Sequence, residues 1–285
     1  MTVRGPIIAR PLGSFLGKIR EGGIIRAMSD EILWKKAQDA RREIFRFKTR
    51  TQNGHLASCL CTVDVLVSLF YDAATTFDHR RDKVLFSKAH GSPAVYPILA
   101  DLGYFPKDEL EKYCLPGGIL RLHSAGSIPG CHFVGGSLGN GIGYAAGRAF
   151  ANPQADHYVV LGDAELYEGS VWETLLFISH HRLKNMHLIV DRNGLGILGA
   201  TEELVKLNPL DKKFEAFGFP VTEVDGHDFN ALRQVFATPR GSGPRVIIAN
   251  TIKGKGVSYM EGKYEYHTII PKSKEDIEKG MAELA

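Results

Sequence analysis

The sequence is poor in cysteine and nearly balanced in charge. Its 285 residues include four cysteines, and 35 lysines and arginines against 32 aspartates and glutamates give a formal net charge of +3. No Cys-x-x-Cys pair occurs, so neither a zinc site nor a disulfide framework is indicated, which fits a reducing cytoplasm. So balanced a charge argues against a nucleic-acid surface. The cations are better interpreted as local partners for an anionic ligand.

Long hydrophobic runs are also absent. No apolar run reaches the ~18 residues of a membrane span. The first 27 residues mix Arg, Gly and Pro with apolar pairs and lack the continuous hydrophobic region of a secretory signal. We therefore expect no membrane segment, and we divide the chain into an N-terminal arm (residues 1–28) and one domain (residues 29–285).

Apolar segments alternate with helical patterns along the chain. A helix is predicted from Ser29 or Asp30, where Leu33, Ala37, Ala40 and Ile44 share one face. Ser273 and Asp276 form a capping box for a last helix. The strands are predicted at residues 82–86, 157–161, 187–190, 220–224 and 245–250. This alternation predicts an α/β fold with a mostly parallel sheet flanked by helices.

The stretch from Leu161 to Asn193 is the most informative part of the sequence. It contains a strand, a helix and a second strand, and the two strands of such a unit lie parallel. Their carboxyl ends meet at one edge of the sheet, so Asp163 and Asn193 should lie side by side although they are thirty positions apart. Two oxygen ligands beside a glycine turn at Gly162 suit Mg²⁺ holding a diphosphate. We also expect the following helix to direct its positive dipole end at the same anion.

Gly-Asp followed about thirty residues later by Asn is the signature of thiamine-diphosphate enzymes. The segments GDAELYEGSVWE and DRNGLGILGATEE resemble the cofactor-binding half of transketolase, and the resemblance runs from about Ser29 to Pro271. It implies the thiamine-diphosphate-binding (PP) fold, with Mg²⁺ held by Asp163, Asn193 and the backbone carbonyl of Leu195. One departure is Ala164: the family reads Gly-Asp-Gly, but the third residue here is alanine, whose methyl group would crowd a close approach of the backbone to the diphosphate. A plain α/β strand end is the alternative interpretation.

The resemblance assigns further site residues. It places four histidines along the substrate channel, two of which, His90 and His267, also reach the cofactor; the four are His55, His90, His123 and His267. The glycine turn that contributes Gly136, Leu138 and Gly139 is implied to lie under the thiamine, and Gly162 and Ala164 beside the diphosphate. Glu168 matches a glutamate at a subunit contact. The alternatives are a solvent-facing turn histidine for His55 and a helix-surface glutamate for Glu168.

Three features of the sequence leave the identity of the substrate or the assignment of site residues undetermined. In the irregular, glycine- and proline-rich stretch 107–136, which we expect to be a surface loop, His123 lacks the family's neighbouring proline and acidic residue. His132 stands in the expected channel where another residue type is common. The loop 251–256, with its repeated Lys-Gly pair, either lies at the ligand edge or is simply solvated. His227 is interpreted as a turn histidine rather than a catalyst.

By resemblance, the chain takes part in transferring a two-carbon ketol unit from a ketose or ketose phosphate to an aldose. Transketolase has a second (Pyr) domain that grips the aminopyrimidine of the cofactor and supplies an activating glutamate, and the present chain ends after the first domain. We therefore expect the diphosphate-binding subunit of a split enzyme, with a Pyr-domain partner in an α₂β₂ assembly. The alternatives are a deoxyxylulose-phosphate-synthase-like acyloin former, which Asn53–Ser58 would also suit, and a degenerate scaffold marked by Ala164.

Overall fold

The computed structural model describes residues 28–72, 74–133 and 135–285, so the predicted arm lies, apart from Met28, outside the described residues. The centre of the fold is a sheet of five parallel strands in the order β1-β2-β3-β5-β4. The strands are β1 (Lys83–Phe86), β2 (His157–Gly162), β3 (Met186–Arg192), β4 (Val221–Asp225) and β5 (Arg245–Asn250). All five predicted strands are present, and the predicted fold class is confirmed.

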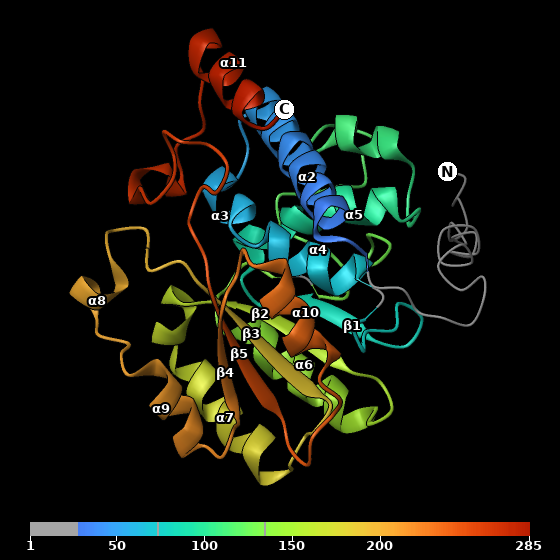
Figure 1. Cartoon of the computed structure of the whole chain (residues 1–285), viewed down its shortest axis with the longest axis vertical. Helices are drawn as coiled ribbons and strands as arrows, with labels where there is room; N and C mark the ends of the chain where they lie inside the picture. Colours follow the sequence, from blue (N-terminus) through green and yellow to red (C-terminus); the bar gives the residue numbers. More distant parts are fainter. Residues whose placement is uncertain (1–27, 73, 134) are drawn as a thin grey trace.

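Helices cover both faces of the sheet (Figure 1). One layer contains α2 (Asp30–Thr51), α3 (Leu56–Leu60), α4 (Val63–Tyr71), α5 (Tyr96–Asp101), α10 (Phe229–Ala237) and α11 (Lys274–Glu283). The other contains α6 (Asn140–Ala151), α7 (Gly169–His180) and α9 (Leu210–Ala216). The shorter helices are α8 (Thr201–Leu204), η1 (Ala89–Val95), η2 (Lys107–Lys112), η3 (Ala164–Tyr167) and η4 (Tyr264–His267). Of the described helices, none is both long and apolar enough to cross a membrane.

Successive side chains of a strand point to opposite sides of the sheet, and the helices on both faces bury both sets in β2, β3 and β5, whereas β4 at the edge of the sheet is largely exposed. In β2, Tyr158 and Val160 belong to the core beneath α2 and α4, whereas Val159 and Leu161 belong to the core beneath α6 and α7. The predicted apolar face of α2 is also buried, with Leu33, Ala37, Ala40 and Ile44 at most 4% exposed. Ser273 accepts the N–H of Asp276 at 3.0 Å, as predicted for the last helix.

Two expectations about local structure are wrong. The chain does not enter a long helix directly after Gly162: the 3-10 helix η3 intervenes and α7 begins only at Gly169. The anion contact expected at the N-terminus of this helix stays a prediction. The stretch 107–136 is irregular, but it is not a simple surface loop, because Tyr113 and Leu120 are fully buried in the core.

Two glycines in α6 provide a matched test of this packing. A methyl group at Gly141 would lie 2.5 Å from the Cα atom of Ser87, whereas one at Gly147 would meet no atom within 4 Å. We expect Gly141→Ala to destabilise the chain by ~1–3 kcal/mol through overpacking. Gly147→Ala should instead stabilise it by up to ~1 kcal/mol, because alanine favours a helix. Urea unfolding of both variants checks this, and equal shifts would contradict the packing described.

Candidate active site

The candidate site lies at the edge of the sheet that the carboxyl ends of the strands form. Gly162 at the end of β2 pairs with Asp191 in β3, so the residues that follow the two strands are neighbours. The Asp163 carboxylate accepts the N–H of Gly194 at 2.6 Å, which places it directly against the turn that starts at Asn193. The predicted juxtaposition of Asp163 and Asn193 is therefore present, while their role as metal ligands stays a prediction.

The oxygen atoms at this edge are held in place by backbone N–H groups. Besides Gly194, the N–H of Ala164 donates to Asp163 at 2.8 Å, and the N–H of Leu195 donates to the Asn193 side-chain oxygen at 3.1 Å. Burial, followed by the charge of Asp191, raises the pKa of Asp163 to about 6. A cation at this carboxylate would relieve that penalty, and oxygen donors of this kind suit Mg²⁺. The residues present therefore fit the ion that the sequence predicts.

No imidazole or thiolate metal site competes with this oxygen set. Within residues 28–72, 74–133 and 135–285, no group of three or more His, Cys, Asp or Glu side chains is arranged to hold a metal ion. The candidate metal site therefore combines one carboxylate, one amide oxygen and one backbone carbonyl. The methyl group of Ala164 faces Gly196: a β-carbon on that glycine would lie 3.8 Å from it.

Sequence reasoning did not single out Lys253, which is central to this edge. Its ammonium group donates to the carbonyl of Leu195 at 3.0 Å and to Nδ1 of His267 at 2.9 Å, and the residue is 1% exposed. Burial, with the charge of Lys88 second, lowers the pKa of Lys253 to about 8. The solvated-loop interpretation of residues 251–256 is thus wrong for Lys253. Its position directly after a strand that ends at the ligand edge is the signal that could have identified it.

A buried ion pair lies beneath the site. The Lys88 ammonium donates to the Asp191 carboxylate, to the carbonyl of Ser58 at 3.1 Å and to the Cys61 thiol at 3.3 Å. Burial alone would lower the pKa of Lys88, but the charge of Asp191 outweighs it and the pKa is raised. Burial alone would raise the pKa of Asp191, but the charge of Lys88 keeps the pKa of this carboxyl below its usual value. The pair joins the end of β1 to the end of β3.

Glu165 ties the glycine turn to the strand ends. One of its carboxylate oxygens accepts the Ser87 hydroxyl at 2.5 Å and the N–H of Gly139 at 2.8 Å, and the other accepts the N–H of Gly162 at 3.0 Å. Burial raises the pKa of this carboxyl. No sequence pattern distinguishes Glu165 from its neighbours, because the three partners come from three separate segments. The turn that carries Leu138 is therefore fixed against β1 and β2.

Glu168 lies against the same glycine turn. Gly139 has a φ of +80°, and a β-carbon there would lie 2.8 Å from the β-carbon of Glu168. Glu168 itself is exposed at the start of α7, and Gly136 is exposed at the other end of the turn. A β-carbon at Gly136 would lie 3.5 Å from Nδ1 of His123. Glu168, which was predicted at a subunit contact, and His123, which was predicted in the channel, therefore both lie next to the glycine turn.

Three of the four predicted channel histidines form a cluster. The ring centroids of His55, His90 and His267 lie 5.0–5.3 Å apart, and Nδ1 of His55 donates to the carbonyl of His267 at 3.0 Å. His55 is half-buried, so the interpretation as a solvent-facing turn histidine is wrong. Burial lowers the pKa of all three, and for His267 burial and then Lys253 lower the pKa to about 3. The three rings are therefore neutral near pH 7, and each offers one N–H donor and one lone pair for hydrogen bonding.

The fourth predicted channel histidine lies near the cluster, whereas its loop departs from expectation. His123 lies beside Gly136, its charge acts on His55, and burial lowers its own pKa. His132 does not lie in the channel. Burial lowers its pKa to about 4, and the charges next in importance are Lys83 and Arg148, at the opposite edge of the sheet from the site. The neighbouring Cys131 is buried in the core.

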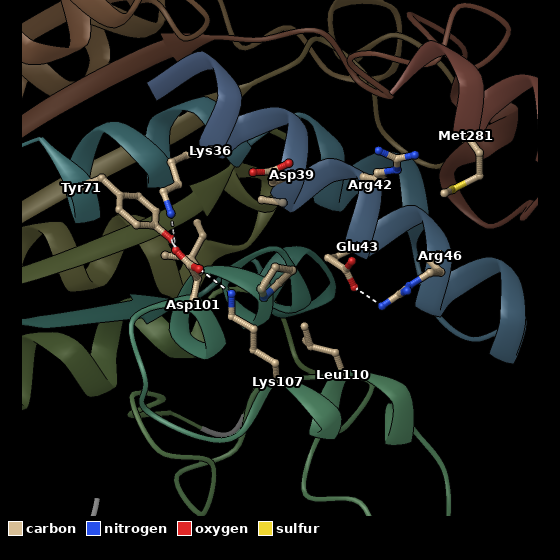
Figure 2. Close-up of a pocket in the computed structure, with 13 residues that line it drawn as sticks. Lys36, Asp39, Arg42, Glu43, Arg46, Tyr71, Asp101, Lys107, Leu110 and Met281 are labelled. Carbon is tan, nitrogen blue, oxygen red and sulfur yellow. Dashed lines mark hydrogen bonds and ion pairs between the residues drawn. The ribbon is translucent and has the colours of Figure 1, made fainter. Parts of the chain in front are cut away.

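A groove of about 600 Å³ on the α2 side of the molecule is separate from this chemistry (Figure 2). Figure 2 shows Lys36, Tyr71 and Lys107 directed at Asp101, and Arg46 directed at Glu43. Burial would raise the pKa of Asp101, but these hydrogen bonds lower it to about 2. Most of the charges that line the groove thus pair with one another, and none of the lining residues belongs to the strand-end site.

A parallel sheet whose strand ends carry an Asp–Asn oxygen set, a fixed glycine turn and an imidazole cluster defines a cofactor-binding domain of the thiamine-diphosphate class. Residues 45–283 match the family model described as "Transketolase, thiamine diphosphate binding domain". The chain belongs to the transketolase family, and the predicted family is confirmed.

Relatives of similar length are named as subunits. An apulose-4-phosphate transketolase subunit of Actinobacillus succinogenes is 36% identical over 269 residues, which cover 90% of this chain and 97% of the relative. The 6-deoxy-6-sulfo-D-fructose transketolase subunit SqwG of Clostridium sp. (strain MSTE9) is 37% identical, covering 76% of this chain and 83% of the relative. The solved transketolase of Campylobacter jejuni has 27% identity and a TM-score of 0.80, covering 90% of this chain. The present chain spans only 43% of that protein.

The buried imidazoles predict a pH dependence of stability. The folded chain holds the pKa of His267 at about 3, below the ordinary value of 6.5, so the unfolded chain takes up a proton first as the pH falls. Stability contributed by the neutral ring is therefore present above pH 6.5 and is lost progressively below it. His267→Gln should make this loss shallower between about pH 6.5 and 5 in urea unfolding, with His180→Gln as the exposed-histidine control. Identical pH slopes for wild type and His267→Gln would contradict the burial of this ring.

Proposed function

We propose that this chain is the diphosphate-binding subunit of a two-subunit transketolase-like enzyme that uses thiamine diphosphate and Mg²⁺. It would transfer a two-carbon ketol unit from a ketose or ketose phosphate to an aldose. The observation that carries the proposal is the convergence of Asp163, Asn193 and the Leu195 carbonyl beside the His55–His90–His267 cluster. The four cysteines are free thiols, which supports a cytoplasmic location.

The strand-end oxygens have the chemistry to hold the cation. Asp163, Asn193 and the carbonyl of Leu195 are the proposed Mg²⁺ ligands, and the ion would balance the charge that burial disfavours on Asp163. The backbone at Gly162 and Ala164 would face the diphosphate. The buried ammonium of Lys253 supports an anion at the same edge. Its hydrogen bond to the Leu195 carbonyl would have to adjust when the ion binds.

The protein's own contribution to catalysis is positioning and proton transfer. Thiamine diphosphate, when bound, supplies a nucleophilic carbon that accepts the two-carbon unit. The half-buried imidazoles of His55, His90 and His267 would orient the substrate hydroxyls and carry protons at the oxygen that gains or loses charge. Since burial depresses the pKa of each ring, these groups are available as neutral acceptors at pH 7. His123, beside the glycine turn, would reach the substrate from the other side.

Exposed apolar side chains support a partner chain. On α6 and α7, four large apolar side chains are 38–63% exposed: Tyr144, Phe150, Leu176 and Phe177. The rings of Phe150 and Phe177 pack against each other with centroids 5.8 Å apart, and exposed apolar side chains gathered in this way are typical of a protein interface. The partner would be a Pyr-domain chain that grips the aminopyrimidine, and the simplest assembly is α₂β₂ with two-fold symmetry.

The donor sugar is proposed to differ from that of ordinary pentose-phosphate transketolase. The neighbours of His123 depart from the usual pattern, and the two subunit-type relatives carry the names of different substrates, apulose 4-phosphate and 6-deoxy-6-sulfo-D-fructose. These names support an unusual ketose donor and leave open which one. A panel of ketoses with the reconstituted enzyme identifies it.

Cofactor binding can be tested on the isolated chain. A ligand that binds only the folded state stabilises it by ~2.7 kcal/mol at a hundredfold excess over its Kd, so thiamine diphosphate with MgCl₂ should raise the Tm. Asp163→Ala should abolish this rise, whereas Asp108→Ala, an exposed carboxylate on η2, should retain it. Calorimetry with and without EDTA measures the part due to Mg²⁺. An equal rise in wild type and Asp163→Ala would overturn the assignment.

The need for a partner is tested by reconstitution. The isolated chain should show negligible ketol transfer with thiamine diphosphate, Mg²⁺ and any sugar pair, because one wall of the cofactor cleft and the activating glutamate would come from the partner. Adding the Pyr-domain chain should restore activity near an equimolar ratio, and the Asp163→Ala variant mixed with the same partner should stay inactive. Full activity from the isolated chain, verified free of host transketolase, contradicts the split-enzyme proposal.

A further inference from the structure

The segment that carries Lys253 is held by three other contacts. The hydroxyl of Thr251 donates to the Asp191 carboxylate, and the N–H of Gly254 donates to the carbonyl of Ala57 at 3.1 Å. Between them, the N–H of Ile252 donates to Nε2 of His227 at 2.9 Å. The residue next to Lys253 is therefore anchored by a histidine from a different loop, the one that follows β4.

The hydrogen bonds of His227 define the state of its ring. A backbone N–H can only donate, so Nε2 must carry a lone pair. The other nitrogen, Nδ1, lies 2.6 Å from the Asp64 carboxylate, which can only accept when ionised, so Nδ1 carries the proton. Only the neutral Nδ1–H tautomer makes both contacts. The side chain is 13% exposed, so water does not readily replace either partner.

Asp64 is itself braced from α2. Both terminal nitrogens of Arg41 donate to its carboxylate, at 2.9 and 2.5 Å, and the two residues are 3% and 4% exposed. Burial would raise the pKa of Asp64, but Arg41 and the hydrogen bond from His227 lower it, which keeps the carboxylate ionised. Because Asp64 is already paired with Arg41, its carboxylate can accept the hydrogen bond of His227 while the imidazole stays neutral.

The two loops approach each other closely at this point. The N–H of Gly226 donates to the carbonyl of Asn250 at 2.7 Å, and a β-carbon on Gly226 would lie 2.5 Å from the methyl group of Thr251. Glycine at this position therefore lets the imidazole of His227 reach the N–H of Ile252. The chain of contacts from Arg41 to Ile252 ends one residue before the ammonium that bonds Leu195 and His267.

We propose that His227 is a positioning residue for Lys253: its neutral ring, oriented by Asp64, fixes the N–H of Ile252 and so keeps the Lys253 ammonium at the strand ends, next to His267. This inference rests on the proposed function in so far as Lys253 faces the cofactor diphosphate. His227 would touch neither cofactor nor substrate. Its loss should weaken cofactor binding because Lys253 is no longer held, while the fold stays intact.

Glutamine and asparagine separate the two hydrogen bonds of the ring. The side-chain oxygen of glutamine reaches the position of Nε2, so His227→Gln keeps an acceptor for Ile252. The amide nitrogen of asparagine reaches the position of Nδ1, so His227→Asn keeps a donor for Asp64 and loses the acceptor. We expect His227→Asn to raise the Kd for thiamine diphosphate with MgCl₂ about tenfold, and His227→Gln by less than about threefold. Calorimetry on the full chain measures both values, and urea unfolding verifies that both variants fold.

Hydrogen exchange of the cofactor-free chain gives a second measurement. The Ile252 amide should exchange faster in His227→Asn than in wild type and stay protected in His227→Gln. Equal protection of Ile252 in wild type and His227→Asn, or equal losses of affinity in the two variants, would overturn the positioning role. A wild-type chain that binds no thiamine diphosphate would overturn the proposed function instead, and the exchange comparison would still decide whether His227 anchors the segment.

Discussion

The buried pair of Lys88 and Asp191 is the interaction on which the site depends. It joins the ends of β1 and β3 at a point where neither side chain reaches water, and leaving one charge there unpaired would cost roughly 3–5 kcal/mol. Asp191 also accepts the hydroxyl of Thr251, and Lys88 donates to the carbonyl of Ser58 within α3. Four separate segments are therefore aligned by one ion pair. The loops that carry Asn193 and Lys253 extend from these aligned strand ends.

The charges around this ion pair suit both a cation and an anion at the carboxyl edge of the sheet. Lys88 and Lys253 place two ammonium groups near the strand ends, and Lys88 contributes to the depressed pKa of Lys253. An anion bound here would therefore find preorganised positive charge in a region that excludes water. The negative charge of Asp163 is instead disfavoured, because burial and the charge of Asp191 raise its pKa. A magnesium diphosphate, which brings a cation to the carboxylate and an anion to the lysines, satisfies both.

Much of the fold and part of the site could be predicted from the sequence, because they depend on local patterns. Continuous apolar runs locate strands buried on both faces, and parallel strands bring Asp163 and Asn193 to one edge. Glu165 and Lys253 were missed because their roles come from hydrogen bonds between segments distant in sequence, which no spacing reveals. His132 was misplaced for a related reason: which residues of an irregular loop are buried, as Cys131 is, depends on packing against segments distant in sequence.

One side of the candidate site is open to solvent. Glu165 holds the glycine turn against β1 and β2 from below, but Gly136 and Glu168 on its outer side are exposed, and the histidine cluster is only half-buried. Electrostatic stabilisation of a reacting group is weak wherever water can enter. A partner surface that covers this side and extends along α6, which begins at the glycine turn, would also bury the exposed apolar side chains of α6 and α7. Closure of the cofactor cleft and assembly with a partner would then be a single event, since one contact surface serves both.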